Sequence, residues 1–216
     1  MAREGDVAVA RARPHESKIY YELSHLYDRI FARVFFPRIR STLAELAIPP
    51  GAKVLEVGVG TGLSLSAYPA HADVLGVDLA PGMLERAQEK VAENDWRNIR
   101  LEQGDALDLK FPDASFDYVT SFHVVTVVPD SLQMMQEIAR VCRPGGTVVI
   151  INHFRSERPW LAKFVDRLDP VTRRLGWRTT LSFADLFRET PLELQRRFKT
   201  SSRSLFTVAI AKKRAS

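Results

Sequence analysis

The first apolar pattern in the chain has the period of a helix. Residues 19, 23, 26, 27, 30, 31, 34 and 35 are apolar or aromatic, and polar residues separate them. This spacing predicts an amphipathic helix that ends at Phe36-Pro37, because proline interrupts helices. A second, short helix is expected over residues 38–47, before Pro49-Pro50-Gly51.

From residue 53 onward, short apolar runs alternate with amphipathic segments. The pattern predicts strands at 53–57, 74–77, 99–103, 116–121 and 147–152, and helices at 62–68, 82–93 and 131–142. Strands that alternate with helices indicate a parallel sheet covered on both faces. Residues 54–152 are therefore expected to form a doubly wound, Rossmann-like α/β core.

The pattern changes after residue 152. Residues 155–190 read as helices rich in basic and aromatic side chains, and 195–200 and 205–211 read as an antiparallel β-hairpin at the sheet edge. No linker divides the chain. We expect one domain over 1–216, with a helical cover over 15–48 and a helical insertion over 155–190.

Length and composition exclude several classes of protein. The chain has 216 residues, of which 45% are hydrophobic and 26% charged, as in ordinary globular proteins. Its apolar runs fall short of the roughly 20 residues that span a bilayer, and its N-terminus lacks the apolar region of a secretory signal. Cys142 cannot form an internal disulfide, and the five histidines lack metal-ligand spacing. A cytoplasmic protein without metal is expected.

Charge is divided unevenly along the chain. Residues 1–40 carry a net charge of +3, residues 41–154 carry −7, and residues 155–216 carry +9. Two basic ends around an acidic centre are expected if the ends meet an anionic partner. The alternative is a solvated surface with chance asymmetry.

The strongest chemical signal is a strand that runs into a glycine-rich turn. Residues 54–62 read Val-Leu-Glu-Val-Gly-Val-Gly-Thr-Gly, with Glu56 two residues before the first glycine. Glycines let a backbone turn sharply and approach a ligand at the carboxyl end of a strand. A dinucleotide fingerprint needs G-x-G-x-x-G, but Leu63 stands where its third glycine belongs.

The glycine turn resembles motif I of the class I S-adenosylmethionine-dependent methyltransferases. Three further elements extend the resemblance to about residue 152. Asp78 ends the second strand, 22 residues after Glu56, where a carboxylate can accept hydrogen bonds from both ribose hydroxyls. Gly104-Asp105-Ala106 follows the third strand, and Arg143-Pro144-Gly145-Gly146 precedes the fifth.

The resemblance implies S-adenosylmethionine as the cofactor and a set of residues that hold it. The methionine part is assigned to Glu56, Gly58, Gly60 and Gly62; the ribose and adenine to Asp78, Leu79 and Met83; and the adenine edge to Gly104, Asp105 and Ala106. The tip of the fourth strand, Ser121-Phe122-His123, is expected beside the sulfonium.

The substrate side has a narrower resemblance. Residues 122–130, the leading segment with Tyr20, Tyr21 and residues 27–31, and Ile151-Asn152-His153-Phe154 resemble the short bacterial phosphatidylethanolamine N-methyltransferases. Their relatives, the quinone-biosynthesis C-methyltransferases, share the core. The Asn/Asp-Pro-Pro-Tyr/Phe element of enzymes that methylate nucleobase amines is missing, because Ser121-Phe122-His123-Val124 stands in its place.

Four residues are candidates for catalysis. His153 and His123 are expected at the strand edge where active sites assemble, and imidazole titrates near neutral pH. Tyr20 and Tyr27 could accept hydrogen bonds from a substrate ammonium and attract a methylated amine through their rings. Each of the four could instead be structural, as a hydrogen-bonded histidine or a packed aromatic.

Three functions remain open at this point. The first is successive N-methylation of phosphatidylethanolamine, with that lipid, its methylated derivatives and an anionic membrane surface as partners. The second is C- or O-methylation of a quinone or another hydrophobic small molecule. The third is a non-catalytic membrane or nucleic-acid binding module, although intact cofactor residues and the lack of a base-stacking platform argue against it.

A lipid acceptor would place the enzyme on the inner face of the membrane as a peripheral protein. The first predicted helix carries Phe31, Phe35 and Phe36 on its apolar side and arginines nearby, so it can lie among lipid headgroups. It can equally be a lid packed on the core, because amphipathicity alone does not separate the two.

Overall fold

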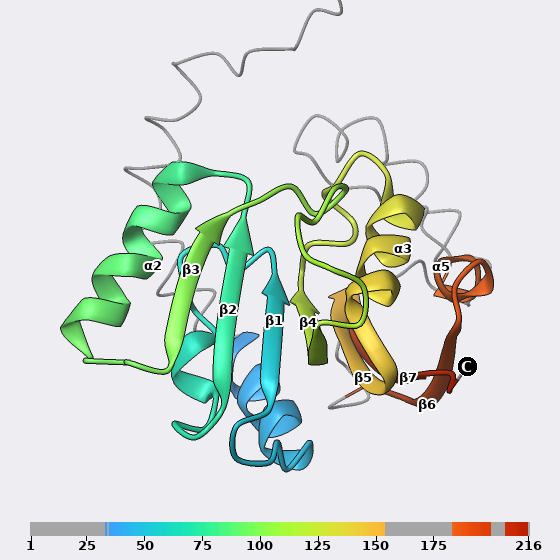
Figure 1. The fold of residues 1–216 in the computed structure, drawn as a ribbon, viewed down its shortest axis with the longest axis horizontal. Coiled ribbons are helices and arrows are strands. Elements are labelled where there is room, and N and C mark those ends of the chain that lie inside the picture. Colours follow the sequence, from blue (N-terminus) through green and yellow to red (C-terminus); the bar gives the residue numbers. More distant parts are fainter. Residues whose placement is uncertain (1–32, 34, 154–182, 200–205, 216) are drawn as a thin grey trace, which may run out of the picture.

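A computed structural model describes residues 33, 35–153, 183–199 and 206–215. Seven strands form one sheet in the order β3-β2-β1-β4-β5-β7-β6 (Figure 1). They are β1 (Lys53–Val57), β2 (Asp73–Asp78), β3 (Ile99–Gln103), β4 (Phe116–Phe122), β5 (Cys142–His153), β6 (Leu192–Phe198) and β7 (Phe206–Lys213). β1 to β5 are parallel, and β7 lies antiparallel between β5 and β6. The predicted doubly wound sheet with a C-terminal hairpin is confirmed.

Helices cover both faces of the sheet. The described helices after residue 45 are η1 (Leu65–Ala67), α2 (Pro81–Glu93), α3 (Ser131–Val141) and α5 (Phe183–Arg188). Helical residues 35–45, η1 and α2 contribute side chains to one buried apolar cluster, while α3 and α5 contribute to the other. Both sides of β1 and β4 are therefore buried, so the polar residues that these strands carry, such as Glu56 and Thr120, are buried as well.

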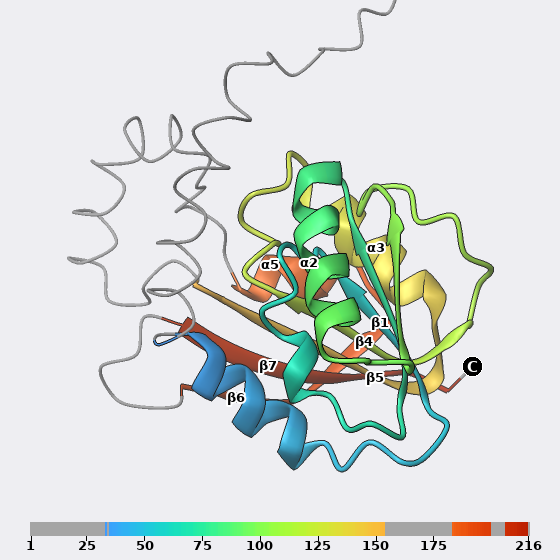
Figure 2. The ribbon, with the colours of Figure 1, turned by 90° about the vertical axis from the view of Figure 1, so that its left-hand side faces the viewer.

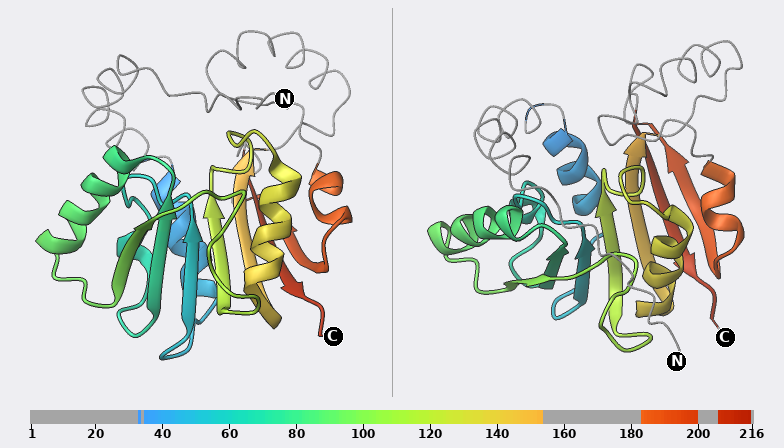
Figure 3. Two further views of the ribbon diagram at one scale, coloured as in Figure 1. Left: turned by 45° about the horizontal axis from the view of Figure 1, so that its top comes forward. Right: turned by 90° about the horizontal axis from the view of Figure 1, so that it is seen from above.

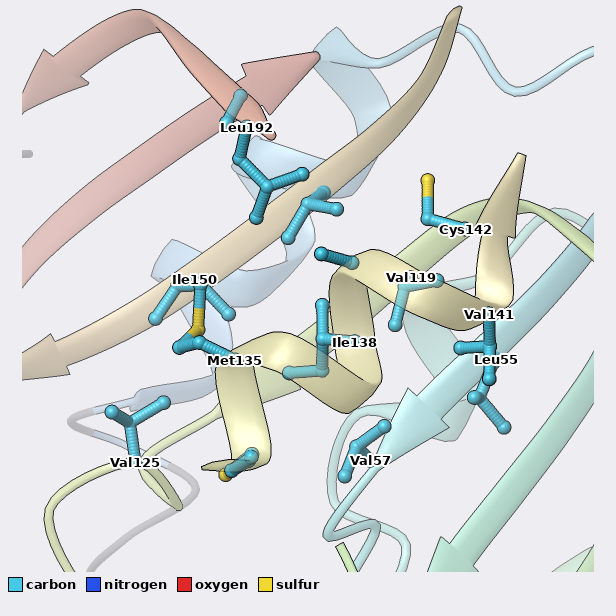
Figure 4. Close-up of a cluster of buried hydrophobic side chains, with 14 of the residues drawn as sticks. Leu55, Val57, Val119, Val125, Met135, Ile138, Val141, Cys142, Ile150 and Leu192 are labelled. Atoms are coloured by element: carbon cyan, nitrogen blue, oxygen red, sulfur yellow. The ribbon is translucent and has the colours of Figure 1, made fainter. Parts of the chain in front are cut away.

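Helix α3 shows how the apolar periodicity becomes packing. Met135 and Ile138 are fully buried and point at the sheet, with Val119 of β4 and Ile150 of β5 in the same cluster (Figure 4). Asp130 caps the helix, since its Oδ1 accepts hydrogen bonds from two backbone N–H groups at 3.0 Å. The cap fixes where the preceding loop ends, and that loop forms part of the site.

The helix predicted to open at residues 62–68 is mostly wrong. Only Leu65–Ala67 is helical, as a 3-10 turn. Gly62 has φ +76°, which a helix cannot accommodate, and Tyr68 is extended before Pro69. Ser64 stands at the N-cap position, but its hydroxyl donates to Glu56 instead of capping the turn.

The predicted break at Phe36-Pro37 is also wrong, because residues 35–45 are helical through Pro37. A proline inside a helix removes one N–H donor. Burial of Phe35, Ile39 and Leu43 on the sheet offsets this loss. In Figure 2 this helix, drawn in blue, runs beside β6, and an Arg196–Glu45 ion pair joins the two.

Strand β5 starts five residues earlier than predicted. The turn residues Arg143-Pro144-Gly145-Gly146 belong to its first part, opposite a register shift between Phe116 and Tyr118 of β4. Gly145 has φ +72°, and a side chain on Gly146 would collide with the Cys142 sulfur. An irregular pairing of this kind keeps the strand continuous through a turn-like sequence.

Most of the predicted cover and insertion lies outside the described residues, namely 15–32 and 34 of the cover and 155–182 of the insertion. The single-domain organisation therefore stays a prediction. None of the helices in the described ranges is long and apolar enough to cross a membrane.

Candidate active site at the carboxyl edge of the sheet

The strand order reverses between β1 and β4, and this is where doubly wound sheets bind ligands. Figure 3 (right) views the molecule from the side toward which β1 to β3 point. A pocket of about 300 Å³ lies at this edge. It is lined by Val57, Gly58, Val77, Asp78, Leu79, Gly104, Asp105, Ala106, Leu107, Val124, Val127, Val128 and Pro129. Two carboxylates thus stand in a mainly apolar cavity.

The glycine turn forms one wall of this pocket. The N–H groups of Gly58 and Val59 donate to the Val77 carbonyl at 2.8 and 3.0 Å, which ties the turn to β2. Gly58 has φ +79°, and a side-chain carbon built there would overlap both methyl groups of Val124. Only glycine lets the turn and the loop after β4 approach this closely.

Asp78 is fixed at the end of β2 by two backbone donors. Its Oδ2 accepts from the N–H of Gly60 at 2.8 Å, and its Oδ1 accepts from the N–H of Ala80 at 2.9 Å. A carboxylate oxygen has lone pairs for more than one donor. Asp78 can therefore hold the glycine turn and still accept hydrogen bonds from ribose hydroxyls.

Asp105 is the second carboxylate that lines the pocket. Its Oδ1 accepts from the N–H of Leu107 at 2.9 Å, which shapes a tight turn after β3. The N–H of Gly104 donates to the Asp78 carbonyl at 3.0 Å and links the two acidic loops. Leu79 is 63% exposed and lies at the pocket with both carboxylates. This arrangement suits a planar base with polar edges.

Glu56 is buried in β1, two residues before the glycine turn, and does not line the pocket. Its carboxylate accepts hydrogen bonds from Ser64 Oγ at 2.5 Å and from the Tyr68 hydroxyl at 2.7 Å. Tyr68 is also 2.7 Å from the Thr120 hydroxyl on β4. Burial raises the pKa of Glu56 to about 7, against the lowering effect of its two hydrogen bonds; the charge of Asp78 raises it further. The network ties β1 to η1 and β4.

The structure brings together six of the predicted cofactor residues. They are Gly58, Asp78, Leu79, Gly104, Asp105 and Ala106. Six others do not line the pocket: Glu56, Gly60, Gly62, Met83, Ser121 and Phe122.

Packing explains where several of these six lie. Gly60 faces Asp78 with its N–H group. Gly62 lets the turn pack on Ala87 of α2, since an added carbon would be 3.2 Å from that side chain. Ser121 and Phe122 are buried within the sheet.

Sequence reasoning missed the wall that the loop after β4 supplies. Val124, Val127, Val128 and Pro129 line the pocket, and Val127 is 48% exposed. The sequence contains a sign of this wall, because a run of apolar residues follows the end of β4 and stops at Pro129 and the helix cap Asp130. Apolar side chains in an exposed loop often mark a ligand surface.

His123 lies beside this loop in a cluster of rings. Its ring centroid is 4.3 Å from that of Phe35 and 4.9 Å from that of Phe206, and these two phenyl rings are 4.8 Å apart. The backbone of His123 has φ +65°, and its N–H donates to the Ile151 carbonyl at 2.7 Å. A non-glycine residue in this conformation often marks a functional edge.

Arg38 completes the ring cluster with a positive charge. Its guanidinium carbon is 5.0 Å from the centroid of the Phe206 ring, a cation–π geometry. Burial lowers the pKa of this guanidinium. Phe35 is 8% exposed and packs against the sheet edge. Its side chain is therefore buried against the rings of His123 and Phe206 and is not presented to a membrane.

The other catalytic candidates are only partly described. The backbone of His153 ends β5 and pairs with Phe206 of β7, so it lies at the same edge as the ring cluster. Tyr20 and Tyr27 lie outside the described residues. Within the described ranges, no group of three or more His, Cys, Asp or Glu side chains could hold a metal ion.

Comparison with known proteins agrees with this geometry. A family model described as a methyltransferase domain matches residues 55–150. A phosphatidylethanolamine N-methyltransferase of Cereibacter sphaeroides is 39% identical over 188 residues, covering 87% of this chain and 92% of that protein. The crystal structure of a SAM-dependent methyltransferase from Aquifex aeolicus has a TM-score of 0.66 at 18% identity, covering 89% of this chain and 97% of that one.

A demethylmenaquinone methyltransferase of Lysinibacillus sphaericus is 34% identical over 153 residues. The match covers 67% of this chain and 64% of that protein. The chain belongs to the S-adenosylmethionine-dependent methyltransferase family. It is an enzyme of that class, with S-adenosylmethionine as its cofactor, and its relatives include enzymes named for a phospholipid and for a quinone.

The pocket fits this cofactor on its own chemistry. Gly58 lets the turn and Val124 meet without a side chain between them, Asp78 can accept hydrogen bonds from ribose hydroxyls, and Asp105 is a second carboxylate in the same mainly apolar pocket. When bound, the cofactor supplies an electrophilic methyl group on a positively charged sulfur. The residues of the chain then hold its polar ends, cover it with apolar side chains and align the acceptor.

Proposed function

We propose that this enzyme methylates the amine of phosphatidylethanolamine at a membrane surface, in successive steps toward phosphatidylcholine. The observation that carries the proposal is the extent of the similarity to the Cereibacter sphaeroides enzyme. That match covers 92% of the relative, whereas the match to the quinone enzyme covers 64% of it. At 188 residues, it extends well beyond residues 55–150, the part that defines the methyltransferase domain. The residues before 55 and after 150 would then bind the acceptor substrate.

N-methylation places defined demands on this chain. An ammonium group has no lone pair to attack with, so the acceptor must lose a proton before or as the methyl group is transferred. His123 and the end of β5, which carries His153, lie at the edge beside the pocket and are the candidates to orient the amine or accept its proton. Tyr20 and Tyr27 are proposed to hydrogen-bond to the same amine.

The loop after β4 would keep water away from the reacting atoms. Val124 closes over Gly58, and Val127 and Val128 line the same pocket. An apolar wall beside a charged cofactor favours transfer to the aligned amine over loss to water. The same wall accounts for an exposed Val127, whose partner would be the bound cofactor or the acceptor.

Membrane-surface action is supported by charge. The acidic centre of the chain is flanked by segments of net charge +3 and +9. Basic residues near an anionic leaflet each contribute about 1 kcal/mol. The proposed location is the cytoplasmic face of the membrane, with peripheral attachment, and no nucleic acid is expected as a partner.

The second candidate is C-methylation of a quinone precursor, which the similarity to the demethylmenaquinone methyltransferase favours. The chemistry differs at the acceptor, since a ring carbon needs no ammonium deprotonation. One assay separates the two functions. The purified protein is given S-adenosylmethionine with a labelled methyl group and vesicles that contain either phosphatidylethanolamine or demethylmenaquinone reduced chemically to its hydroquinone, because only the electron-rich reduced ring can attack the methyl group.

We expect label in mono-, di- and trimethylated phosphatidylethanolamine, resolved by mass spectrometry, and none in the quinone. Label in the quinone alone would reject the proposal. A variant with Asp78→Ala serves as the control for cofactor dependence, because it should lower both reactions without changing which acceptor is used.

A further inference from the structure

The loop between β4 and α3 forms the apolar wall of the pocket and has a buried polar side chain at its centre. Thr126 is 1% exposed, although the next residue, Val127, is exposed at the pocket. The Thr126 hydroxyl donates a hydrogen bond to Oδ1 of Asn152 at 3.0 Å. Asn152 is the last residue but one of β5 and is fully buried. A hydrogen bond between two buried side chains therefore joins the pocket wall to the end of β5.

Other hydrogen bonds make the loop a compact turn around Thr126. The N–H groups of Val127 and Val128 both donate to the Val124 carbonyl, at 2.8 and 3.3 Å. The Ser131 hydroxyl donates to the carbonyl of the residue before Thr126 at 2.7 Å, which ties the turn to the first residue of α3. Val124, Val127 and Val128 line the pocket, so the position of this turn sets the position of the wall.

The bond between Thr126 and Asn152 connects the two parts of the site. On one side, the turn meets the glycine turn of the cofactor pocket through the close approach of Val124 to Gly58. On the other side, Asn152 directly precedes His153, the last residue of β5. Breaking the bond would leave polar atoms unpaired in the core, so one arrangement of loop and strand is favoured. Alignment matters here, because a misplacement of about 1 Å can slow a reaction about a hundredfold.

We infer that Thr126 and Asn152 are positioning residues for methyl transfer, because their hydrogen bond holds the pocket wall in register with the end of β5. Neither residue lines the pocket, so each acts through its neighbours. Thr126 acts through the valines of the loop, and Asn152 acts through the strand end that carries His153. The inference needs S-adenosylmethionine as the methyl donor but no particular acceptor, so it goes beyond the proposed function and does not depend on it.

The first test compares two variants of the full chain with S-adenosylmethionine and phosphatidylethanolamine in neutral detergent, or with the hydroquinone of demethylmenaquinone if that is the acceptor methylated. Thr126→Val removes the hydroxyl and keeps the shape. We expect it to lower kcat about tenfold and to weaken S-adenosylmethionine binding by no more than about threefold, because Asp78 and Asp105 stay in place. Thr126→Ser keeps the hydroxyl and should recover most of kcat. Thr147→Val, the matched control, removes a buried hydroxyl five residues before Asn152 and should keep the wild-type kcat.

Hydrogen exchange supplies a readout that needs no acceptor. With S-adenosylmethionine bound, the amides of Val127 and Val128 should exchange about tenfold faster in Thr126→Val than in the wild type, because the turn is no longer held to β5. The amide of Ile150, in the middle of the sheet, reports unfolding of the whole protein and should change less. A loss of general stability would instead speed exchange at Ile150 and leave the loop amides as they are.

A double-mutant cycle tests whether the two residues act as a pair. Asn152→Ala removes every contact of that side chain, so the informative quantity is the effect of Thr126→Val in its presence. We expect Thr126→Val to lower kcat much less in Asn152→Ala than in the wild type. Equal effects in the two backgrounds would overturn the inference, as would a wild-type kcat or unchanged loop exchange in Thr126→Val. Methylation of the hydroquinone alone would reject the proposed function, and the same variants would still decide the inference.

Discussion

The two halves of the site are built in different ways. The cofactor half comes from consecutive strand ends, β1, β2 and β3, each followed directly by the residues that line the pocket. The proposed acceptor half is the ring cluster of Phe35, Arg38, His123 and Phe206, which come from three chain segments more than eighty residues apart. A ligand site made of local strand-to-loop motifs can be read from sequence, whereas a site made by distant segments depends on the sheet order.

The cofactor half is also the more constrained of the two. In it, backbone groups make most of the contacts, as with the Gly60 and Ala80 N–H groups on Asp78. In the acceptor half, side-chain rings pack on one another, and ring packing tolerates exchange of similar shapes. We therefore expect relatives with different acceptors to differ mainly in the second half, and substitutions to be more damaging in the first.

The largest effect is expected at Gly58. In Gly58→Ala the new methyl group would overlap Val124, and the residue would also be strained at φ +79°. Cofactor affinity measured by calorimetry should weaken by more than about 3 kcal/mol, or roughly two hundredfold, and the free energy of unfolding should fall by about 1–3 kcal/mol.

Two further variants test the cause of that loss. Gly60→Ala also has a positive φ but meets no atom within 4 Å, so it should cost less than Gly58→Ala. Adding Val124→Ala to Gly58→Ala removes the overlapping methyl groups and should recover part of the affinity. If Gly60→Ala is as damaging as Gly58→Ala, backbone strain and not the contact with Val124 is the cause.

The next effect is a pH dependence that originates at Glu56. Its pKa is about 7 in the folded protein and 4.5 in an unfolded chain, so the folded state binds the proton more tightly. This contribution to stability is present below pH 4.5 and is lost as pH rises to about 7, with a total of about 3 kcal/mol. Glu56→Gln lacks the titrating group.

The measurement is the free energy of unfolding of wild type and Glu56→Gln by urea from pH 4.5 to 8. The stability of the wild type relative to the variant should fall with pH over this window and level off above pH 7. Glu85→Gln, at an exposed position on α2, should keep a constant difference from wild type. A constant difference for Glu56→Gln would show that Glu56 does not titrate as stated.

The sequence predicts the residues of the cofactor half better than those of the acceptor half, and the reason is physical. The bounds predicted for β1 and β3 match the structure to the residue. β1 is a largely buried strand that ends at a glycine turn, and β3 alternates Ile99 and Leu101 with polar residues. Asp78 and Asp105 were placed by their position after a strand, which the parallel order turns into proximity. Glu56 was assigned to the cofactor by resemblance. In the structure the Glu56 side chain is buried and accepts hydrogen bonds from Ser64 and Tyr68 instead.

The acceptor half could not be assembled from sequence. In the sequence, Phe35 is one apolar position of an amphipathic helix. The spacing alone does not show whether that apolar face packs on the sheet or contacts lipid. Its contact with His123 and Phe206 depends on β7 pairing next to β5, which is a long-range event. The helix continued through Pro37 for the same reason, since burial of neighbouring side chains outweighed the local propensity.

A smaller effect is expected at Asp78. Asp78→Ala removes an acceptor for ribose hydroxyls and releases two backbone N–H groups of the cofactor turn. Calorimetry should show S-adenosylmethionine binding weakened by about 1.5–3 kcal/mol. Asp73→Ala is the matched control, because Asp73 is at the other end of β2 and pairs with Arg100. Equal losses in both variants would point to a general effect on β2 instead of the cofactor site.

The smallest effect concerns the membrane, and it extends the comparison to the outer surface of the acceptor half. Arg33 is exposed two residues before Phe35, while Arg97 is exposed before β3 at the opposite edge of the sheet. If the acceptor half faces the bilayer, Arg33→Gln should lower the affinity for vesicles containing phosphatidylglycerol by about 1 kcal/mol, or roughly fivefold. Arg97→Gln should leave it unchanged.

The Arg33 effect should shrink at high salt, because charges farther apart than about 8–10 Å are screened even at physiological ionic strength. Vesicle sedimentation with increasing phosphatidylglycerol measures each of these differences. Equal losses for both arginines would mean that the protein meets anionic surfaces without a preferred orientation, and the acceptor half would then have to receive its lipid by another route.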